Sequence, residues 1–276
     1  MIAFIGSVFS PYYALARRRG RGDPRNHVAL NVALYGPRAS RWAMTERGKG
    51  SLDARRADLV IGPSNLSWNG ATLTFNINEV TAPFPNRLKG VVRVHPTALS
   101  QGRFALDAAG AHQWGPIAPR ARVEADFESP SLNWAGSGYL DSNAGAHPLE
   151  DDFVRWDWSR WPSGGDTLVL YDVKRRVGGR HSLALRYDSQ GNVEPFEPPP
   201  RAKLAKTGWR IVRDVQSESA AHIMQTLEDT PFYARSVVSG QLLGNSLSGV
   251  HESLSLDRFK SPVVQMMLPF RMPRRR

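Results

Sequence analysis

The chain has 276 residues and no cysteine, and its 36 Lys and Arg against 25 Asp and Glu give a formal net charge of +11. This length supports one large domain or two modest ones with a substantial core. The lack of cysteine excludes a disulfide framework, a thiolate nucleophile and cysteine-ligated zinc, and it suits a reducing compartment such as the bacterial cytoplasm.

Short runs of alternating, β-branched or aromatic residues recur between Gly, Pro, Asn and Asp, whereas long helical periodicity is scarce. The predicted strands are residues 27–35, 41–45, 66–68, 71–80, 90–96, 121–127, 153–159, 167–173, 182–187, 209–214, 221–228, 234–243 and 248–256. Many short strands at near-regular spacing favour barrels or sandwiches over a parallel sheet with crossover helices. We therefore expect an all-β fold made of two antiparallel barrels.

A domain boundary is expected near residue 128, where Pro130 is followed by small residues. This predicts an N-terminal β-barrel domain over residues 1–127 and a C-terminal β-barrel domain over residues 128–276. The Pro-rich stretch 190–203 resembles a second linker. Too few residues follow it to build a complete barrel, so we interpret it as a long loop inside the second domain.

Arginine clusters lie near both ends of the chain. They are Arg17, Arg18, Arg19 and Arg21 in the first cluster and Arg271, Arg274, Arg275 and Arg276 in the second. A charge run is usually a solvated face, and attraction to anionic lipid headgroups is the alternative. No base-stacking module or recognition helix accompanies them, so no nucleic-acid partner is expected.

The N-terminal apolar run precedes its positive charges instead of following them, and Ser10-Pro11 interrupts it, so we do not interpret it as a signal peptide. No stretch reaches the roughly 18 apolar residues that a membrane-spanning helix needs. The sequence therefore predicts a chain that is soluble or lies peripherally on a bilayer.

Common catalytic signatures are missing: the sequence contains no GxGxxG, no P-loop, no GxSxG and no HExxH motif. The seven histidines show no metal-ligand spacing. We therefore expect no metal.

Aromatic residues alternate with polar ones in three places. Trp156 and Trp158 share one strand face, His112 and Trp114 form a similar alternate pair, and Tyr139 shares a face with Asp141 if the strand extends that far. Each pattern is also typical of a barrel core, and the Asp-Ser-Asn-Ala-Gly run at 141–145 suits a turn. The alternation alone does not show that these pairs meet.

Several motifs resemble the carotenoid 1,2-hydratase family, also called hydroxyneurosporene synthase. They are "FIGSVFSPYYALARRRGRGDPRNHVALNVALYG", "RWAMTERG", "HQWGPIAPRARVEADF" and "GYLDSNAGAHPLEDDFVRWDWSR", and the resemblance covers nearly the whole chain. It implies two lipocalin-like β-barrel domains in a hydro-lyase of photosynthetic bacteria. Such a lyase adds water across the terminal C1=C2 bond of acyclic carotenes without a cofactor. It also implies cytoplasmic location at the inner or photosynthetic membrane, and leaves other carotenoid-pathway enzymes open as partners.

The resemblance places the family's active residues on His112, Trp114, Tyr139 and Asp141. We expect Asp141 to protonate the alkene, Trp114 and Tyr139 to stabilise the cation, and His112 to activate water. Three tryptophans are assigned to the substrate-binding wall: Trp156, Trp158 and Trp161.

Two features depart from the family pattern. Related lipocalin-like hydratases and cyclases often carry Asp-His-x-Trp-Gly, whereas this chain reads Asp141-Ser142-Asn143-Ala144-Gly145. Asp141 therefore lacks an adjacent histidine, and His112 is the candidate to supply an imidazole in its place. Longer members also have a strand before the segment equivalent to Met1. Either the start site lies upstream or the first barrel lacks its N-terminal strand.

Two other functions remain open from the residues: a non-catalytic carotenoid or terpenoid carrier, and a terpenoid cyclase or isomerase of the same fold. A carrier would need the aromatic cavity but no protonated Asp141. A cyclase would let the same cation lose a proton or be captured internally. The sequence does not choose among neurosporene, lycopene and their derivatives, or between hydration at one end and at both.

Overall fold

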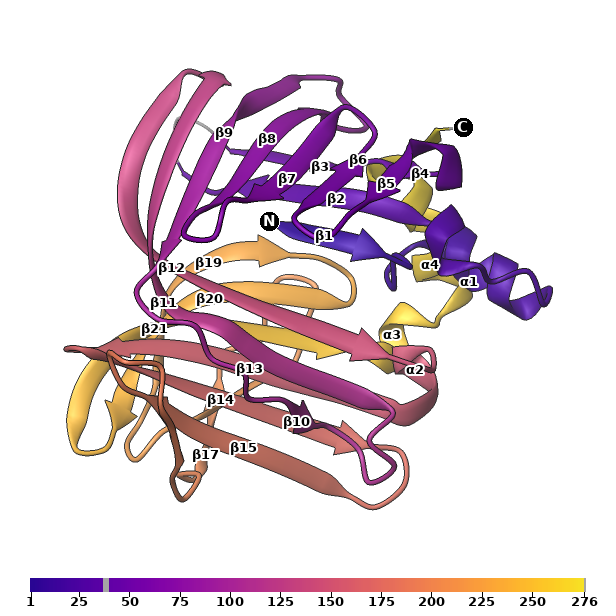
Figure 1. Ribbon diagram of the computed structural model, residues 1–276. Helices are drawn as coiled ribbons and strands as arrows, with labels where there is room; N and C mark the ends of the chain where they lie inside the picture. The colour runs from indigo at the N-terminus through magenta and orange to yellow at the C-terminus, as the bar shows by residue number, and fades with distance from the viewer. Residues whose placement is uncertain (37–39, 276) are drawn as a thin grey trace. The chain divides into compact units, whose positions relative to one another are not determined.

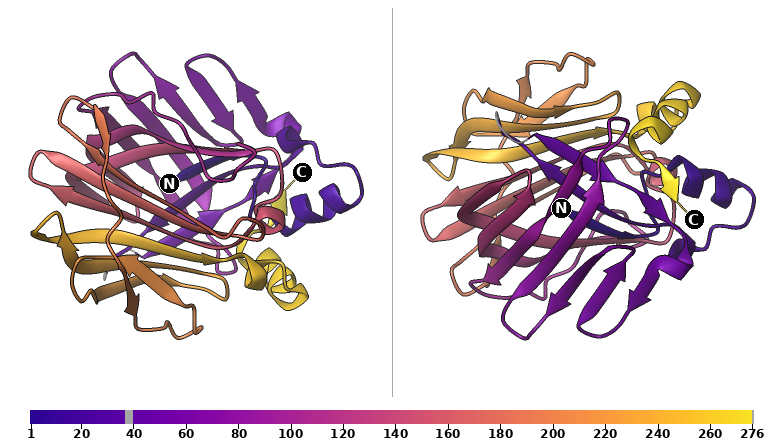
Figure 2. Two further views of the ribbon diagram at one scale, coloured as in Figure 1. Left: turned by 90° about the horizontal axis from the view of Figure 1, so that it is seen from below. Right: turned by 90° about the horizontal axis from the view of Figure 1, so that it is seen from above.

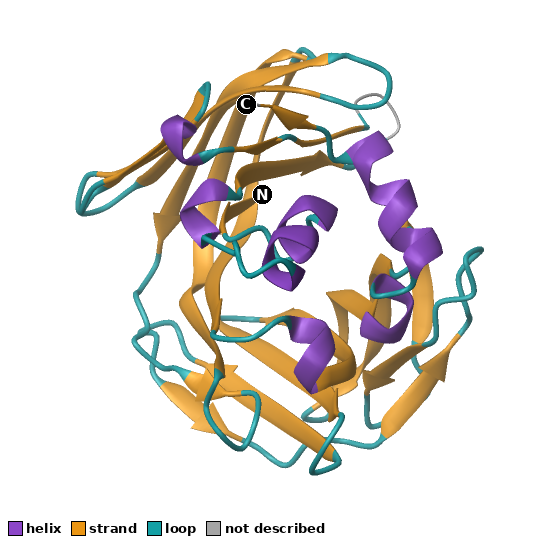
Figure 3. Ribbon diagram, turned by 90° about the vertical axis from the view of Figure 1, so that its right-hand side faces the viewer, coloured by secondary structure: helices purple, strands orange, loops and turns teal. Residues whose placement is uncertain are grey.

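The computed structural model describes residues 1–36 and 40–275, and most of its regular structure is strand (Figure 3). The all-β prediction is therefore confirmed. Contacts divide the chain into two compact units. Unit 1 comprises residues 1–96, 121–138 and 265–276, and unit 2 comprises residues 97–120 and 139–264.

Unit 1 is built largely from the first third of the chain. Its elements are β1 (Ile2–Ile5), α1 (Pro11–Arg18), the 3-10 helix Pro24–Asn26, β2 (Val28–Leu34), β3 (Arg41–Met44), β4 (Glu46–Arg47), the 3-10 helix Lys49–Ser51, β5 (Leu52–Ala54), β6 (Asp58–Ile61), β7 (Ser64–Trp68), β8 (Leu73–Val80), β9 (Arg87–Pro96) and β22 (Arg274–Arg275). Successive hairpins run from β5 to β9, while β22 pairs in parallel with β4 (Figure 1). Inward alternation on these strands buries a core that includes Leu30, Phe75, Leu88 and Val92.

Unit 2 contains a seven-stranded antiparallel sheet. Its elements are β10 (Phe104–Ala105), α2 (Leu149–Asp152), β13 (Phe153–Ser163), β14 (Asp166–Arg175), β15 (Arg180–Tyr187), β16 (Val193–Pro195), β17 (Arg201–Leu204), β18 (Arg213–Gln216), β19 (His222–Asp229), β20 (Tyr233–Leu242), β21 (Asn245–Ser255) and α3 (Leu256–Phe259). The sheet order is β16-β15-β14-β13-β21-β20-β19, an open path over the described residues. Figure 2 shows its strands, coloured from pink to yellow, in two further views. One face of this sheet buries a core that includes Trp161, Leu168, Leu170 and Val238.

One long hairpin contributes to both units: β11 (His112–Ser129) and β12 (Leu132–Gly145). The contact units are therefore discontinuous, whereas the predicted domains are continuous, at 1–127 and 128–276. The Pro130 signal falls at the turn of this hairpin rather than in a linker. The boundary near residue 128 stays a prediction, while the 190–203 stretch does lie inside unit 2.

The strand predictions differ from the structure in one position and in several omissions, of which β12 is the longest. The strand expected at 209–214 begins only at Arg213, because Thr207–Arg210 forms a turn in which Arg210 has φ +59°. Strand β12 was not predicted, because its Gly, Ser and Asn residues are typical of turns. Cross-strand pairing with β11 overrides that local preference.

The C-terminal helix α4 (Pro262–Arg271) follows α3. Among the described residues, no helix combines the length and the apolar character needed to cross a membrane. Arg276, the last member of the second arginine cluster, lies outside the described residues.

Candidate active site

Strand alternation on β11 and β12 positions four of the predicted site residues within unit 2. His112 and Trp114 are successive inward residues of β11, and both are buried. Strand β12 continues to Gly145, so Tyr139 and Asp141 also alternate on one face. Asp141 therefore lies in a strand and not in a turn.

The structure brings three of these residues into direct contact. The Trp114 indole Nε1–H donates a hydrogen bond of 2.8 Å to Asp141 Oδ2, and the Tyr139 hydroxyl donates one of 3.2 Å to the same oxygen. Both donors are electrically neutral. Asp141 itself is partly buried, so its carboxyl is surrounded mainly by aromatic side chains.

Burial raises the pKa of Asp141 to about 6, and the like charge of Glu252 adds to this effect. The hydrogen bonds from Trp114 and Tyr139 act in the opposite direction, because they favour the carboxylate. About a tenth of such groups hold their proton at pH 7, far more than for an ordinary aspartate. Burial and the Asp141 charge also raise the pKa of Tyr139, which keeps the phenol a neutral donor.

Aromatic rings from β13 and β14 extend the site. Trp158 packs on Tyr139 with ring centroids 5.4 Å apart, and Tyr171 packs edge-on against Trp114 at 5.1 Å. Trp156 contacts Tyr171 at 6.0 Å. Two of the three predicted wall tryptophans therefore belong to one aromatic group with the acid.

Trp161 is placed elsewhere. It lies on the opposite face of β13, is fully buried in the unit 2 core, and donates its Nε1–H to Ser159 Oγ at 2.9 Å. An odd separation from Trp156 and Trp158 produces this reversal, because side chains alternate along a strand. The structure does not bring Trp161 to Asp141.

His112 makes its side-chain hydrogen bond to Asp152 and not to Asp141. Its Nε2 lies 2.7 Å from Asp152 Oδ2, and its ring packs on Phe153 at 4.9 Å. Its other nitrogen, Nδ1, is buried without a hydrogen-bond partner among the described residues. A series of ring contacts leads from His112 through Phe153, Trp156 and Tyr171 to Trp114, which binds Asp141.

Sequence reasoning missed Asp152 and Tyr171. Asp152 closes the short helix α2 within an acidic run, and Tyr171 sits in the apolar run of β14, so neither carries a local signal. Both reach the site through pairing of distant strands, which residue spacing does not report.

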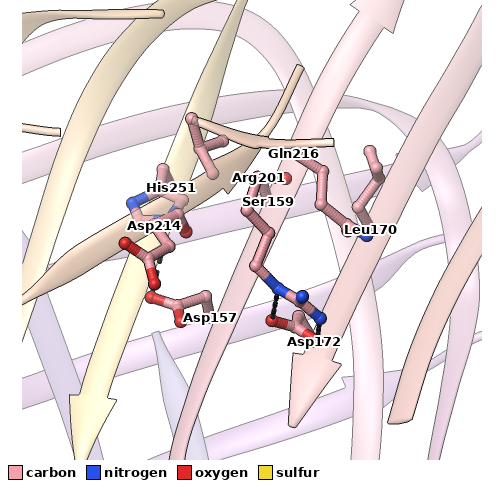
Figure 4. A pocket seen from close by; sticks show the side chains of 9 residues that line it. Asp157, Ser159, Leu170, Asp172, Arg201, Asp214, Gln216 and His251 are labelled. Atoms are coloured by element: carbon pink, nitrogen blue, oxygen red, sulfur yellow. Dashed lines mark hydrogen bonds and ion pairs between the residues drawn. The ribbon is translucent and has the colours of Figure 1, made fainter. Parts of the chain in front are cut away.

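A second cluster of charged groups lies on the opposite face of β13. Asp157, Asp214 and His251 line one side of a small pocket, while Arg201 and Asp172 line the other (Figure 4). Burial raises the pKa of Asp157 to about 6 and lowers that of His251 to about 4. Asp157 is paired with Arg155 at 2.5 Å, and Arg155 also reaches Asp214 at 2.9 Å.

Comparisons with known proteins identify relatives that are named as hydratases. The family model described as carotenoid hydratase CrtC matches residues 1–276. A protein of Thiocapsa roseopersicina named acyclic carotenoid 1,2-hydratase is 58% identical over 277 residues, which cover 99% of this chain and 68% of that protein. A protein of the same name from Cereibacter sphaeroides is 40% identical over 278 residues, which cover 100% of this chain and 98% of that protein.

One solved structure supports the fold alone. A crystal structure of a Nitrosomonas europaea protein described as AttH aligns with a TM-score of 0.59 at 13% identity, over 82% of this chain and 80% of that chain. The full-length family match and the high identity together show that the chain belongs to the carotenoid hydratase CrtC family and is a hydratase, a lyase that adds water to a double bond.

Proposed function

We propose that this hydratase adds water across the terminal C1=C2 double bond of an acyclic carotene such as neurosporene or lycopene, with Asp141 as the proton donor. The observation that carries the proposal is the Asp141 carboxyl, held by the neutral donors Trp114 and Tyr139 among aromatic rings. The substrate class follows from the carotenoid hydratases to which the chain is similar.

The reaction begins with transfer of the Asp141 proton to C2 of the alkene, which leaves a tertiary cation at C1 and a carboxylate on the protein. Trp114 and Tyr139 then stabilise that carboxylate by hydrogen bonds. The π faces of Trp114, Tyr139 and Trp158 stabilise the cation, a contribution of about 2 kcal/mol or more in a desolvated site. Water attacks C1, and loss of its extra proton gives the tertiary alcohol.

His112 is the proposed base for that last proton. A carboxylate at Asp152 accepts a hydrogen bond from the His112 Nε2–H, which fixes the neutral ring in the tautomer whose lone pair is on Nδ1. Nδ1 is buried and has no partner among the described residues, so it is the nitrogen left to accept a proton. Asp152 is thus a positioning residue.

The polyene would lie along the aromatic wall formed by Trp156 and Trp158. The Trp158 indole Nε1–H is buried and has no hydrogen-bond partner among the residues that the structure describes, so it would serve as a donor to the attacking water. Trp161 has no role in this wall, because it packs in the core on the other face.

A carotene is insoluble in water, so we also propose peripheral docking on an anionic membrane surface. Arg18, Arg19 and Arg21 are exposed at the end of α1. On α4, Met266 and Phe270 are 67% and 70% exposed, and a helix with an exposed apolar face suits the headgroup region. The second arginine cluster contributes less, because Arg271 stacks on Trp42 at 4.3 Å and Arg274 pairs with Glu46.

Vesicle flotation tests this docking. We expect more protein on anionic than on neutral vesicles, with recovery falling as salt rises, since each basic residue near the surface contributes about 1 kcal/mol. Equal recovery on both lipids would contradict the electrostatic part. Unchanged binding of a Met266→Ser, Phe270→Ser double variant would contradict the role of α4.

Product analysis in ¹⁸O-labelled water tests the proposed reaction. Lycopene and neurosporene, delivered in vesicles, should each yield a 1-hydroxy product that carries one ¹⁸O. An unlabelled cyclised or isomerised product would identify a cyclase or isomerase instead. Retention of carotene without conversion would identify a carrier.

A further inference from the structure

Three side chains near the end of β12 have the composition of a transition-metal ligand set. They are His112 on β11, His147 in the segment after β12, and Asp152 at the end of α2, all within unit 2. Their ligand atoms lie within 4.8 Å of one another. Asp152 Oδ2 is 2.7 Å from His112 Nε2 and 3.3 Å from His147 Nδ1.

We propose that His112, His147 and Asp152 form a binding site for a zinc-like divalent cation. Two imidazole nitrogens and one carboxylate oxygen suit Zn²⁺ and its transition-metal neighbours, whereas Mg²⁺ and Ca²⁺ prefer all-oxygen sets. Three protein ligands leave a fourth tetrahedral position for water. The carboxylate also supplies negative charge to offset that of the ion.

Of the three proposed ligands, His112 is held rigidly in the interior and His147 is accessible to solvent. His112 is 2% exposed, and its ring is held between Phe153 and the backbone at Gly145, where a methyl group would lie 2.5 Å from Nδ1. The His147 side chain is 60% exposed, so an ion can enter from solvent beside it. His147 and Asp152 are joined by a short segment, which permits the small adjustment that a bound ion requires.

Histidine spacing in the sequence did not indicate this site, because one ligand comes from β11 and the other two follow β12. The hairpin brings them together. The backbone N–H of Ala146 donates to the Ala111 carbonyl at 3.0 Å and fixes that end of the hairpin.

Metal binding would also interfere with the proposed hydration, a consequence that rests on the role of His112 as base. An ion at Nε2 displaces the proton from that nitrogen, so the neutral ring carries its proton on Nδ1. Nδ1 can then no longer accept a proton from water. Occupation of the site should therefore lower turnover.

Calorimetric titration of the full chain with Zn²⁺, after treatment with a chelator, tests the site directly. We expect one saturable equivalent per chain, and His147→Ala should weaken binding by at least roughly tenfold. The matched control is His222→Ala, because His222 is an exposed histidine of the same unit. A lack of saturable binding, or equal affinity in the His147→Ala variant, would overturn the proposal.

Turnover measurements separate this proposal from the hydratase proposal. Zn²⁺ should inhibit the parent and the His222→Ala variant alike, while His147→Ala, compared with its own metal-free turnover, should lose most of the inhibition. Equal inhibition of all three proteins would place the inhibitory metal elsewhere. If the parent does not hydrate carotenes at all, the proposed function fails, while the titration still decides the metal site.

Discussion

The two faces of β13 offer a comparison between two buried carboxyl groups with the same pKa of about 6. Asp141, reached from the Trp158 face, accepts hydrogen bonds from the neutral groups of Trp114 and Tyr139. Asp157, on the opposite face, is paired with the permanently charged Arg155. Equal pKa values therefore arise from different balances of burial and charge.

The difference in partners indicates which of the two carboxyl groups is placed to deliver a proton to an alkene. A guanidinium beside Asp157 holds an opposite charge against the carboxylate, so protonation there breaks an ion pair. At equal pKa both groups hold a proton to the same extent, but Asp141 lies among aromatic rings that can hold an alkene, and its neutral donors still stabilise the carboxylate after the proton has left. A perturbed pKa is thus a guide to function only together with the identity of the partners.

The largest expected effect is on turnover of an Asp141→Asn variant. Asparagine keeps the size and the hydrogen-bond acceptor but has no acidic proton, so hydration should fall by roughly 10²- to 10⁴-fold. Carotene binding and β content should be retained, as measured by retention on the protein and by circular dichroism. Turnover within a few-fold of the parent in a folded variant would remove Asp141 from the reaction.

The matching change on the other face should affect stability instead. Asp157→Asn leaves Arg155 with the carboxylate of Asp214 and also removes a buried carboxylate whose pKa is raised, so the free energy of unfolding should fall by less than the roughly 3 kcal/mol of a fully broken buried pair. Denaturant unfolding measures this loss. We expect turnover within about twofold of the parent, and a hundredfold loss in a folded variant would end the distinction between the two faces.

The pH dependence of stability sharpens the comparison. Burial raises the Asp141 pKa from 3.8 to about 6, so the proton stabilises the folded chain below pH 3.8, and this contribution is lost as pH rises through 6. Asp141→Asn removes the buried carboxylate. The variant should therefore gain stability over the parent between pH 4 and pH 7, by at most about 3 kcal/mol.

Melting temperatures of both proteins across that range test this expectation. The parent's turnover should also decline by about tenfold per pH unit above pH 6, because only the protonated acid can react. A parent that becomes relatively more stable than the variant as pH rises would show that Asp141 is stabilised as a carboxylate.

The smallest expected effect comes from Trp114→Phe, which keeps the ring face but removes the Nε1–H donor. Loss of that hydrogen bond should raise the Asp141 pKa, so the pH at which turnover begins to fall should move upward by about one unit. The matched control is Trp156→Phe, whose ring contacts Tyr171 rather than the acid. An unshifted profile in Trp114→Phe would mean that the indole acts only through packing.

Local pattern accounts for much of the fold and for the pairs in the site. Alternation predicted most strands and placed Tyr139 with Asp141 and His112 with Trp114. It did not predict β12 itself, whose Gly and Asn residues are typical of turns, because cross-strand pairing is not encoded locally. The catalytic roles of these residues stay predictions.

The remaining features of the site depend on contacts between distant segments. Asp152 lies 40 residues from His112, and no spacing links them. Trp161 was grouped with Trp156 and Trp158 by composition, although its odd position on β13 directs it into the core. Strand parity was available in the sequence and would have separated it.

The parallel pairing of β22 with β4 has a consequence for how the chain is made. Glu46 is almost fully buried and meets Arg274, which also donates to the Asn26 carbonyl at 2.9 Å. Synthesis delivers Glu46 to the outside of the ribosome long before Arg274, although domains usually fold in the order in which they emerge. Unit 1 therefore begins first and is completed last, after the whole of unit 2 has been translated. Until then Glu46 can meet His27, 2.9 Å away, but lacks its arginine partner.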